Sequence, residues 1–108
     1  MNLCPGIKAY IAKADELYDD EAEHADVATQ RRAYTDLCRA FARPYPAGVT
    51  AEDRSFSADG ATIPMRVYRP AGQGRPPAIP FFHGGSFVLG DLDSHDSICG
   101  ALKRMLAG

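Results

Sequence analysis

The chain has 108 residues, of which 45% are hydrophobic, 24% charged and 9% aromatic. These proportions are those of a globular domain and exclude collagen-like, disordered and disulfide-scaffold proteins, and the length allows one domain at most. Lysine and arginine number 12 against 14 acidic residues, so the net charge of −2 supplies no field that would collect phosphate backbones. We therefore expect no nucleic-acid partner.

Signals for export or membrane insertion are not visible in the sequence. The N-terminus lacks a basic start followed by an apolar stretch, and the longest charge-free run, Pro76 to Gly90, contains three prolines and is too short to span a bilayer. Three cysteines at long spacings (Cys4, Cys38 and Cys99) match neither a disulfide framework nor a zinc site. The sequence therefore predicts a cytoplasmic protein without a membrane span.

Two helices are predicted before residue 45. In each, apolar residues recur at helical spacing and form one stripe, which is typical of a helix that covers an apolar surface. The first stripe consists of Ile7, Tyr10, Ile11, Ala14, Leu17 and Tyr18, and the second of Val27, Tyr34, Leu37, Cys38 and Phe41. Pro44 and Pro46 end the second helix.

A β-hairpin is predicted between about Glu52 and Arg69, where the apolar pattern changes to a period of two. Asp59-Gly60 separates its two runs, and this pair suits a tight turn with positive φ. Residues 70–77 are rich in glycine and proline and predict a loop.

An α/β order is predicted for the remainder. Ala78–His83 is apolar on both faces and predicts a buried strand of a parallel sheet, although Pro80 is unusual in such a strand. After the glycines, Ser94 to Ala107 predicts a helix with Ile98 and Leu102 on its apolar stripe.

The segment that follows the predicted strand carries the strongest functional signal. It begins His83-Gly84-Gly85-Ser86, and glycines at such a place allow a sharp turn that points backbone N–H groups into a cleft. Pairs of these N–H groups stabilise the oxyanion formed in acyl transfer, and loops of this type lie beside the nucleophile of lipases and esterases. Two glycines after a strand also occur in ordinary turns, so the pair alone does not decide between the two interpretations.

The longer pattern is more specific. Residues 63–70 (IPMRVYRP) and 82–96 (FHGGSFVLGDLDSHD) resemble, in order and spacing, the hormone-sensitive-lipase-like branch of the α/β-hydrolases, which also comprises carboxylesterases and lipases. The resemblance implies cap helices at 1–45 and an incomplete start of the α/β-hydrolase core at 46–108. It also implies ester hydrolysis without a cofactor, and places His83, Gly84, Gly85 and Ser86 on the oxyanion loop, with His83 organising the loop.

Two positions depart from the family pattern. Ser86 stands where a third glycine is commonest, but its N–H group is retained. Pro80 stands in the strand where members carry a β-branched or aromatic residue, which puts the hydrogen bonding of that strand in doubt.

The catalytic triad of this family is not in the sequence. The family needs a serine in a G-x-S-x-G pentapeptide, then an acid and a histidine. None of the serines (Ser55, Ser57, Ser86, Ser94 and Ser97) lies in such a pentapeptide, and the family pattern places the triad beyond residue 108. We therefore predict a fragment of a serine-type carboxylic ester hydrolase, truncated before the nucleophile elbow and inactive alone.

The resemblance also indicates partners. The full-length family takes a small ester substrate or acyl ligand, and a complementary C-terminal fragment is a candidate partner. In the family's strand order, both neighbours of the strand ending at His83 come after the helix at 94–107, so we expect a marginally stable or aggregation-prone chain.

Two other functions stay open. The same fold serves in receptors that bind a ligand without hydrolysing it, so a non-catalytic ligand-binding or interaction module is an alternative. A metal-binding domain is a weaker alternative. Carboxylates and imidazoles gather at His83, Asp91, Asp93, His95 and Asp96, but their spacing matches no ligand signature, and Asp93 and Asp96 suit a helix start. We expect no metal.

Overall fold

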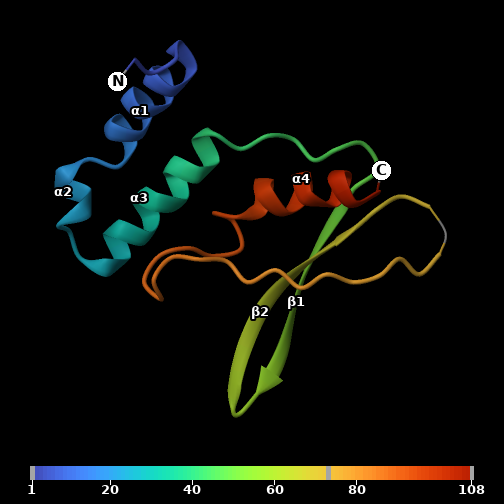
Figure 1. Cartoon of the computed structure of the whole chain (residues 1–108). Coiled ribbons are helices and arrows are strands. Elements are labelled where there is room, and N and C mark those ends of the chain that lie inside the picture. Colours follow the sequence, from blue (N-terminus) through green and yellow to red (C-terminus); the bar gives the residue numbers. More distant parts are fainter. Residues whose placement is uncertain (1, 73, 108) are drawn as a thin grey trace.

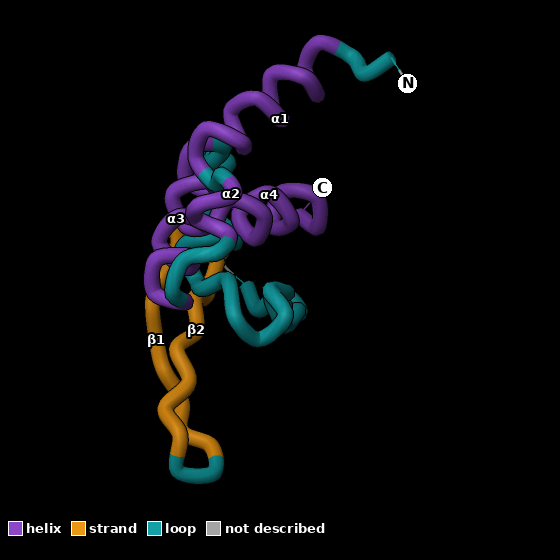
Figure 2. The backbone as a smooth tube through the Cα atoms, turned by 90° about the vertical axis from the view of Figure 1, so that its left-hand side faces the viewer, coloured by secondary structure: helices purple, strands orange, loops and turns teal. Residues whose placement is uncertain are grey.

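The computed structural model of the chain describes residues 2–72 and 74–107, and for 104–107 the backbone alone. Within these residues, four helices and one two-stranded sheet follow one another along the chain (Figure 1). The elements are α1 (Pro5–Leu17), α2 (Asp20–Glu23), α3 (Val27–Ala40), β1 (Thr50–Ala58), β2 (Ala61–Arg69) and α4 (Asp96–Ala107). A side view shows the hairpin of β1 and β2 as an arm that projects from the helical part (Figure 2).

Both predicted N-terminal helices are present, with the short α2 between them. Residues of the acidic stretch cap the helices: the Asp19 carboxylate accepts a hydrogen bond from the Ala22 N–H at 2.8 Å, and the Asp26 carboxylate accepts one from the Thr29 N–H at 3.1 Å. The Tyr10 and Phe41 rings lie with centroids 4.7 Å apart, which joins α1 to the end of α3. The apolar stripes therefore pack partly on each other.

The predicted hairpin is confirmed, and its turn lies where the sequence places it. β1 and β2 pair antiparallel with Ala58 opposite Ala61, so Asp59 and Gly60 form a two-residue turn. Their φ values of 49° and 78° are the positive values that such turns need. The same register places Asp53 opposite Arg66, which becomes important at the site.

The structure corrects the prediction of a buried strand at 78–83. This segment forms no strand, and the Ile79 and Phe82 side chains are 63% and 88% exposed. A strand exists only by hydrogen bonding to a neighbour, and in the described residues β1 and β2 pair solely with each other. The predicted helix is present as α4, which begins at Asp96 rather than at residue 94 because residues 92–95 form a turn.

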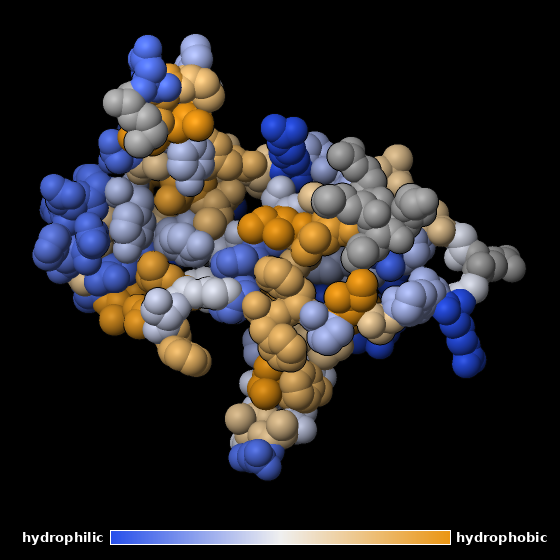
Figure 3. All heavy atoms as spheres, viewed as in Figure 1, coloured by the Kyte–Doolittle hydropathy of each residue, from blue (hydrophilic) through white to orange (hydrophobic). Residues whose placement is uncertain are grey.

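Apolar surface in the described part of the chain is left largely uncovered. No hydrophobic side chain there is buried, and the accessible area of 8479 Å² exceeds the roughly 5,900 Å² of a compact monomer of this size. The radius of gyration is 16.5 Å, against about 13 Å for a compact domain. Figure 3 shows hydrophobic residues on the outside of both the hairpin and the helical part. Marginal stability stays a prediction, and this open surface is its physical basis.

None of the helices in the described residues has the length and apolar character that crossing a bilayer requires. Cys4, Cys38 and Cys99 are free thiols.

Candidate active site

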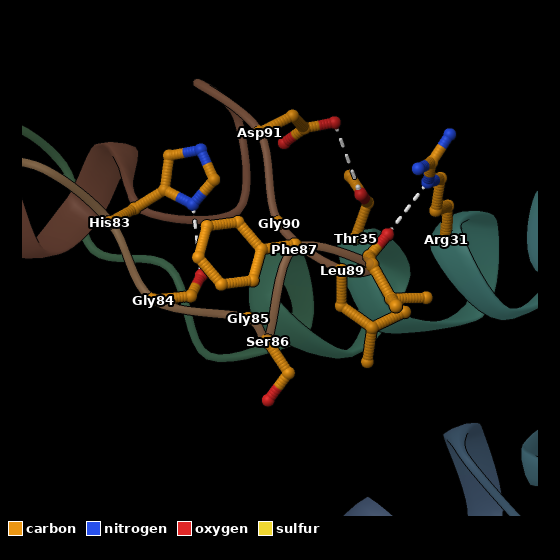
Figure 4. Close-up of a pocket in the computed structure, with 11 residues that line it drawn as sticks. Arg31, Thr35, His83, Gly84, Gly85, Ser86, Phe87, Leu89, Gly90 and Asp91 are labelled. Carbon is orange, nitrogen blue, oxygen red and sulfur yellow. Dashed lines mark hydrogen bonds between the residues drawn. The ribbon is translucent and has the colours of Figure 1, made fainter.

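The predicted oxyanion loop forms a tight turn on the surface, shown in Figure 4. The N–H groups of Val88 and Leu89 both donate to the Gly85 carbonyl oxygen at 2.9 Å. Ser86 and Phe87 take positive φ values of 53° and 62°, a conformation that costs a residue with a side chain roughly 1–2 kcal/mol. Gly85 has a φ of 137°, and a Cβ atom there would overlap the Leu89 carbonyl oxygen. The turn therefore needs glycine at position 85.

The backbone N–H groups of residues 83–87 are unused in the described part of the chain. Gly84, Gly85 and Ser86 donate no hydrogen bond to any residue in the described ranges. The loop, together with Arg31 and Thr35, lines an open pocket of about 540 Å³. The pocket thus has free donors at its wall, which is what an oxyanion or a carboxylate requires.

His83 contacts the loop that it precedes. Its Nδ1 atom lies 2.9 Å from the Gly84 carbonyl oxygen, and because a carbonyl accepts only, Nδ1 is the protonated nitrogen. The His83 ring also stacks on the His95 ring, with centroids 5.0 Å apart. Burial, followed by the nearby His83, lowers the pKa of His95.

Helix α3 also contacts the loop. The Arg31 Nε–H donates to the Val88 carbonyl oxygen at 2.7 Å, and the Thr35 hydroxyl donates to the Asp91 carboxylate at 3.3 Å (Figure 4). Residues 31 and 35 are one helical turn apart and lie on one face of α3. The sequence shows no signal for these contacts, because they join residues more than fifty positions apart.

A reciprocal pair of hydrogen bonds follows the loop. The Ser94 N–H donates to the Asp91 carboxylate at 2.7 Å, and the Asp91 N–H donates to the Ser94 hydroxyl at 2.8 Å. The Ser94 Oγ also lies 2.9 Å from His95 Nδ1, which is the spacing of a nucleophile and its base. Only 7% of Ser94 is exposed, however, so a substrate has no access to this hydroxyl. Ser94 is therefore a structural residue.

A cluster of polar side chains joins the hairpin to the start of α4. At its centre, Arg66 uses all five of its N–H groups. It binds both oxygens of Asp53 at 2.6 and 3.0 Å, an oxygen of Asp93 at 2.9 Å, an oxygen of Asp96 at 2.8 Å and the Leu92 carbonyl at 3.2 Å. We call this group, completed by Tyr45 and Tyr68, the Arg66 cluster.

Asp96 is the shared acceptor of the Arg66 cluster. Its carboxylate accepts from the Tyr45 hydroxyl at 2.6 Å and from the Tyr68 hydroxyl at 2.7 Å, as well as from Arg66. Burial opposes its ionisation, but these three hydrogen bonds outweigh burial and keep the pKa of Asp96 below its usual value. Burial, reinforced by the bond to Asp96, raises the pKa of Tyr45 to about 12.

Asp93 is held by two arginines. Arg66 and Arg39 both bind its carboxylate, which lowers the pKa of Asp93. The prediction of helix-start acids is confirmed for Asp96, the first residue of α4, but both carboxylates serve mainly as partners of Arg66. The hairpin register, which places Asp53 opposite Arg66, is the one sequence signal that could have found part of this cluster.

The Arg66 cluster predicts a loss of stability in acid. Asp53, Asp93 and Asp96 have lower pKa values in the folded chain than their unfolded value of about 4. Their ionised carboxylates therefore stabilise the fold when the pH is above the unfolded pKa of about 4. This stabilisation is lost as the pH falls through the folded pKa values of the three residues. We expect the urea midpoint to fall modestly between about pH 7 and 5, because the pKa of His95 is lowered in the fold, and to fall further below about pH 4 as the three carboxylates are protonated. Equal midpoints at pH 7 and 3 would contradict the assignment.

No group of three or more histidine, cysteine or acidic side chains in the described residues is arranged to hold a metal ion. The five residues that the sequence brings together are divided among three groups. His83 and His95 stack on each other, Asp93 and Asp96 bind Arg66, and the Asp91 carboxylate accepts from Thr35 and Ser94.

Comparisons with known proteins identify relatives of the chain. No family model matches it. It is 38% identical over 75% of its length to the carboxylic ester hydrolase LipN of Mycobacterium tuberculosis, and 34% identical over 96% of its length to an ethyl acetate hydrolase of Pseudomonas putida. It is also 33% identical over 73% of its length to an acetyl esterase of Salmonella typhi. The chain spans 21%, 35% and 24% of these three relatives, respectively.

All three relatives are ester hydrolases by name. The chain belongs to the hormone-sensitive-lipase-like family of carboxylesterases and lipases, of whose members it matches a part.

Proposed function

We propose that this chain supplies the oxyanion-hole part of a serine-type carboxylic ester hydrolase that acts on a small ester. In this proposal residues 1–45 are cap helices, residues 46–108 begin the hydrolase core, and Gly84, Gly85 and Ser86 present the N–H donors. The observation that carries the proposal is that Gly84, Gly85 and Ser86 line an open pocket and have unused N–H groups. The ester hydrolases among the relatives support the reaction class.

The chemistry follows from the N–H groups. Attack on an ester carbonyl moves negative charge onto its oxygen, and N–H groups held in place stabilise that charge without reorganising. One such donor contributes about 10²–10³-fold to the rate. His83, through its bond to the Gly84 carbonyl, organises the start of the loop.

The nucleophile has to come from elsewhere. The sequence holds no G-x-S-x-G pentapeptide, and an oxyanion hole stabilises charge that it cannot itself generate. A polypeptide segment carrying the serine, the acid and the histidine is thus the partner that this proposal requires.

The purified 108-residue chain is expected to hydrolyse p-nitrophenyl acetate no faster than buffer, because it has no activated nucleophile. The release of p-nitrophenol measures this directly. Turnover that survives purification and disappears when one internal serine is changed to alanine would contradict the expectation.

A hybrid enzyme tests whether the chain can supply a working oxyanion hole. In the ethyl acetate hydrolase of Pseudomonas putida, the region that aligns with this chain is replaced by the chain itself. We expect the hybrid to hydrolyse short-chain esters, with the unaltered relative as the reference. A folded hybrid without ester hydrolysis would overturn the proposal.

Ligand binding without hydrolysis is the second candidate, and the open pocket beside Arg31 favours it. It predicts that a short-chain fatty acid shifts the amide signals of residues 84–86 in the isolated chain. Such shifts together with an inactive hybrid would favour this candidate over hydrolysis.

A further inference from the structure

Helix α3 presents a row of polar side chains to the loop. Arg31, Thr35 and Arg39 are spaced by four residues, so they lie along one face of the helix. Arg31 binds the Val88 carbonyl at 2.7 Å, Thr35 binds the Asp91 carboxylate at 3.3 Å, and Arg39 binds the Asp93 carboxylate at 2.8 Å. The three contacts follow the chain from the turn toward α4.

The first of these contacts acts on the most strained part of the loop. Ser86 and Phe87 both have positive φ, and the Phe87 side chain is fully exposed, so its packing contributes nothing to holding the turn. Within the described residues, the only side chain from outside residues 83–90 that binds a backbone carbonyl of this stretch is Arg31. Its bond meets the carbonyl of Val88, directly after the two strained residues.

We propose that Arg31 is a positioning residue of the oxyanion loop. By holding the Val88 carbonyl against α3, it keeps the turn closed around the Gly85 carbonyl and so keeps the N–H groups of Gly84–Ser86 at the wall of the pocket. The inference rests on the proposed function only for the task of those N–H groups. The inference that Arg31 holds the turn closed rests on the contacts alone.

Arg31 and its neighbour Arg32 form a matched pair for the test. Both are exposed arginines of α3, but Arg32 reaches only Thr29 of its own helix, at 2.9 Å. Arg31→Met removes the donor to Val88, Arg31→Lys keeps a donor of similar reach, and Arg32→Met is the control. We expect all three to leave the urea midpoint near that of the unaltered chain, because exposed single contacts add little to global stability.

Amide hydrogen exchange of the isotope-labelled chain reads the loop directly. The amides of Val88 and Leu89, which close the turn, should exchange about tenfold faster in Arg31→Met and be largely restored in Arg31→Lys. Arg32→Met should leave them unchanged. Equal exchange in Arg31→Met and Arg32→Met, or unprotected amides in the unaltered chain, would overturn the proposal.

The hybrid enzyme separates this inference from the proposed function. Arg31→Met should lower kcat about tenfold with KM unchanged, because the loop acts on the transition state. If exchange rises and kcat stays the same, the positioning role holds and the loop is not the oxyanion hole. If neither changes, Arg31 does not position the loop.

Discussion

Replacing Arg66, of whose side chain only 14% is exposed, with methionine is expected to destabilise the chain by about 3 kcal/mol. The methionine fills similar space but leaves the Asp96 and Asp53 carboxylates without their cation and Asp93 with Arg39 alone. It also removes the ion pair between the hairpin and α4, so that of the hydrogen bonds to Asp96 from the hairpin only that of Tyr68 remains. Because typical domains are stable by only about 5–15 kcal/mol and this chain buries no apolar side chain in its described part, most Arg66→Met molecules should be unfolded.

Urea unfolding followed by far-ultraviolet circular dichroism measures this loss. Arg54→Met on β1 is the matched control, because Arg54 pairs with Glu52 at 3.0 Å and both side chains are about half exposed. We expect this control to cost less than about 1 kcal/mol. Midpoints that agree between Arg66→Met and Arg54→Met would show that the Arg66 cluster does not hold the fold.

Changing Gly85 to alanine is expected to lower ester hydrolysis by the hybrid enzyme about 10²–10³-fold. The added Cβ would overlap the Leu89 carbonyl oxygen, and the φ of 137° is one that L-residues rarely adopt. The turn must open, and the backbone of residues 84–86 is then displaced from its place in the lining of the pocket. The kcat of the hybrid with p-nitrophenyl acetate measures the effect.

Gly6→Ala is the control for this substitution. Gly6 lies in α1, and a Cβ atom there meets no other atom within 4 Å. Its hybrid should hydrolyse the ester at the unaltered rate. A Gly85→Ala hybrid of full activity would exclude the loop from transition-state stabilisation.

The sequence predicted the long helices and the hairpin, whose formation depends on residues that are close together along the chain. The hairpin follows from alternation on each side of Asp59-Gly60, and the apolar stripes of α3 and α4 follow from helical spacing. The segment 78–83 has the composition of a buried strand, but composition cannot provide the neighbouring strands that its backbone needs. The same segment is exposed in the structure for that reason.

The site was predictable in part. Glycine spacing located the loop at residues 83–86, and its tight turn is in the structure. The hydrogen bond by which Arg31 holds the loop was not predictable, because Arg31 and Val88 lie 57 residues apart and no local pattern links them. Asp96 shows the same limit, since an acid at a helix start satisfies the sequence pattern whether or not it also binds Arg66 and two tyrosines.

The distance along the chain between α3 and its loop has a consequence for synthesis. At about 5–20 residues per second, the ribosome delivers Val88 roughly 3–11 seconds after Arg31. The hairpin closes within about 10 microseconds of its own emergence. Because β2 ends at Arg69, the hairpin is complete for roughly the last 1–4 of those seconds while α3 still lacks the segment that it contacts. A pause in translation over residues 70–88 prolongs the exposure of α3 to proteases and chaperones.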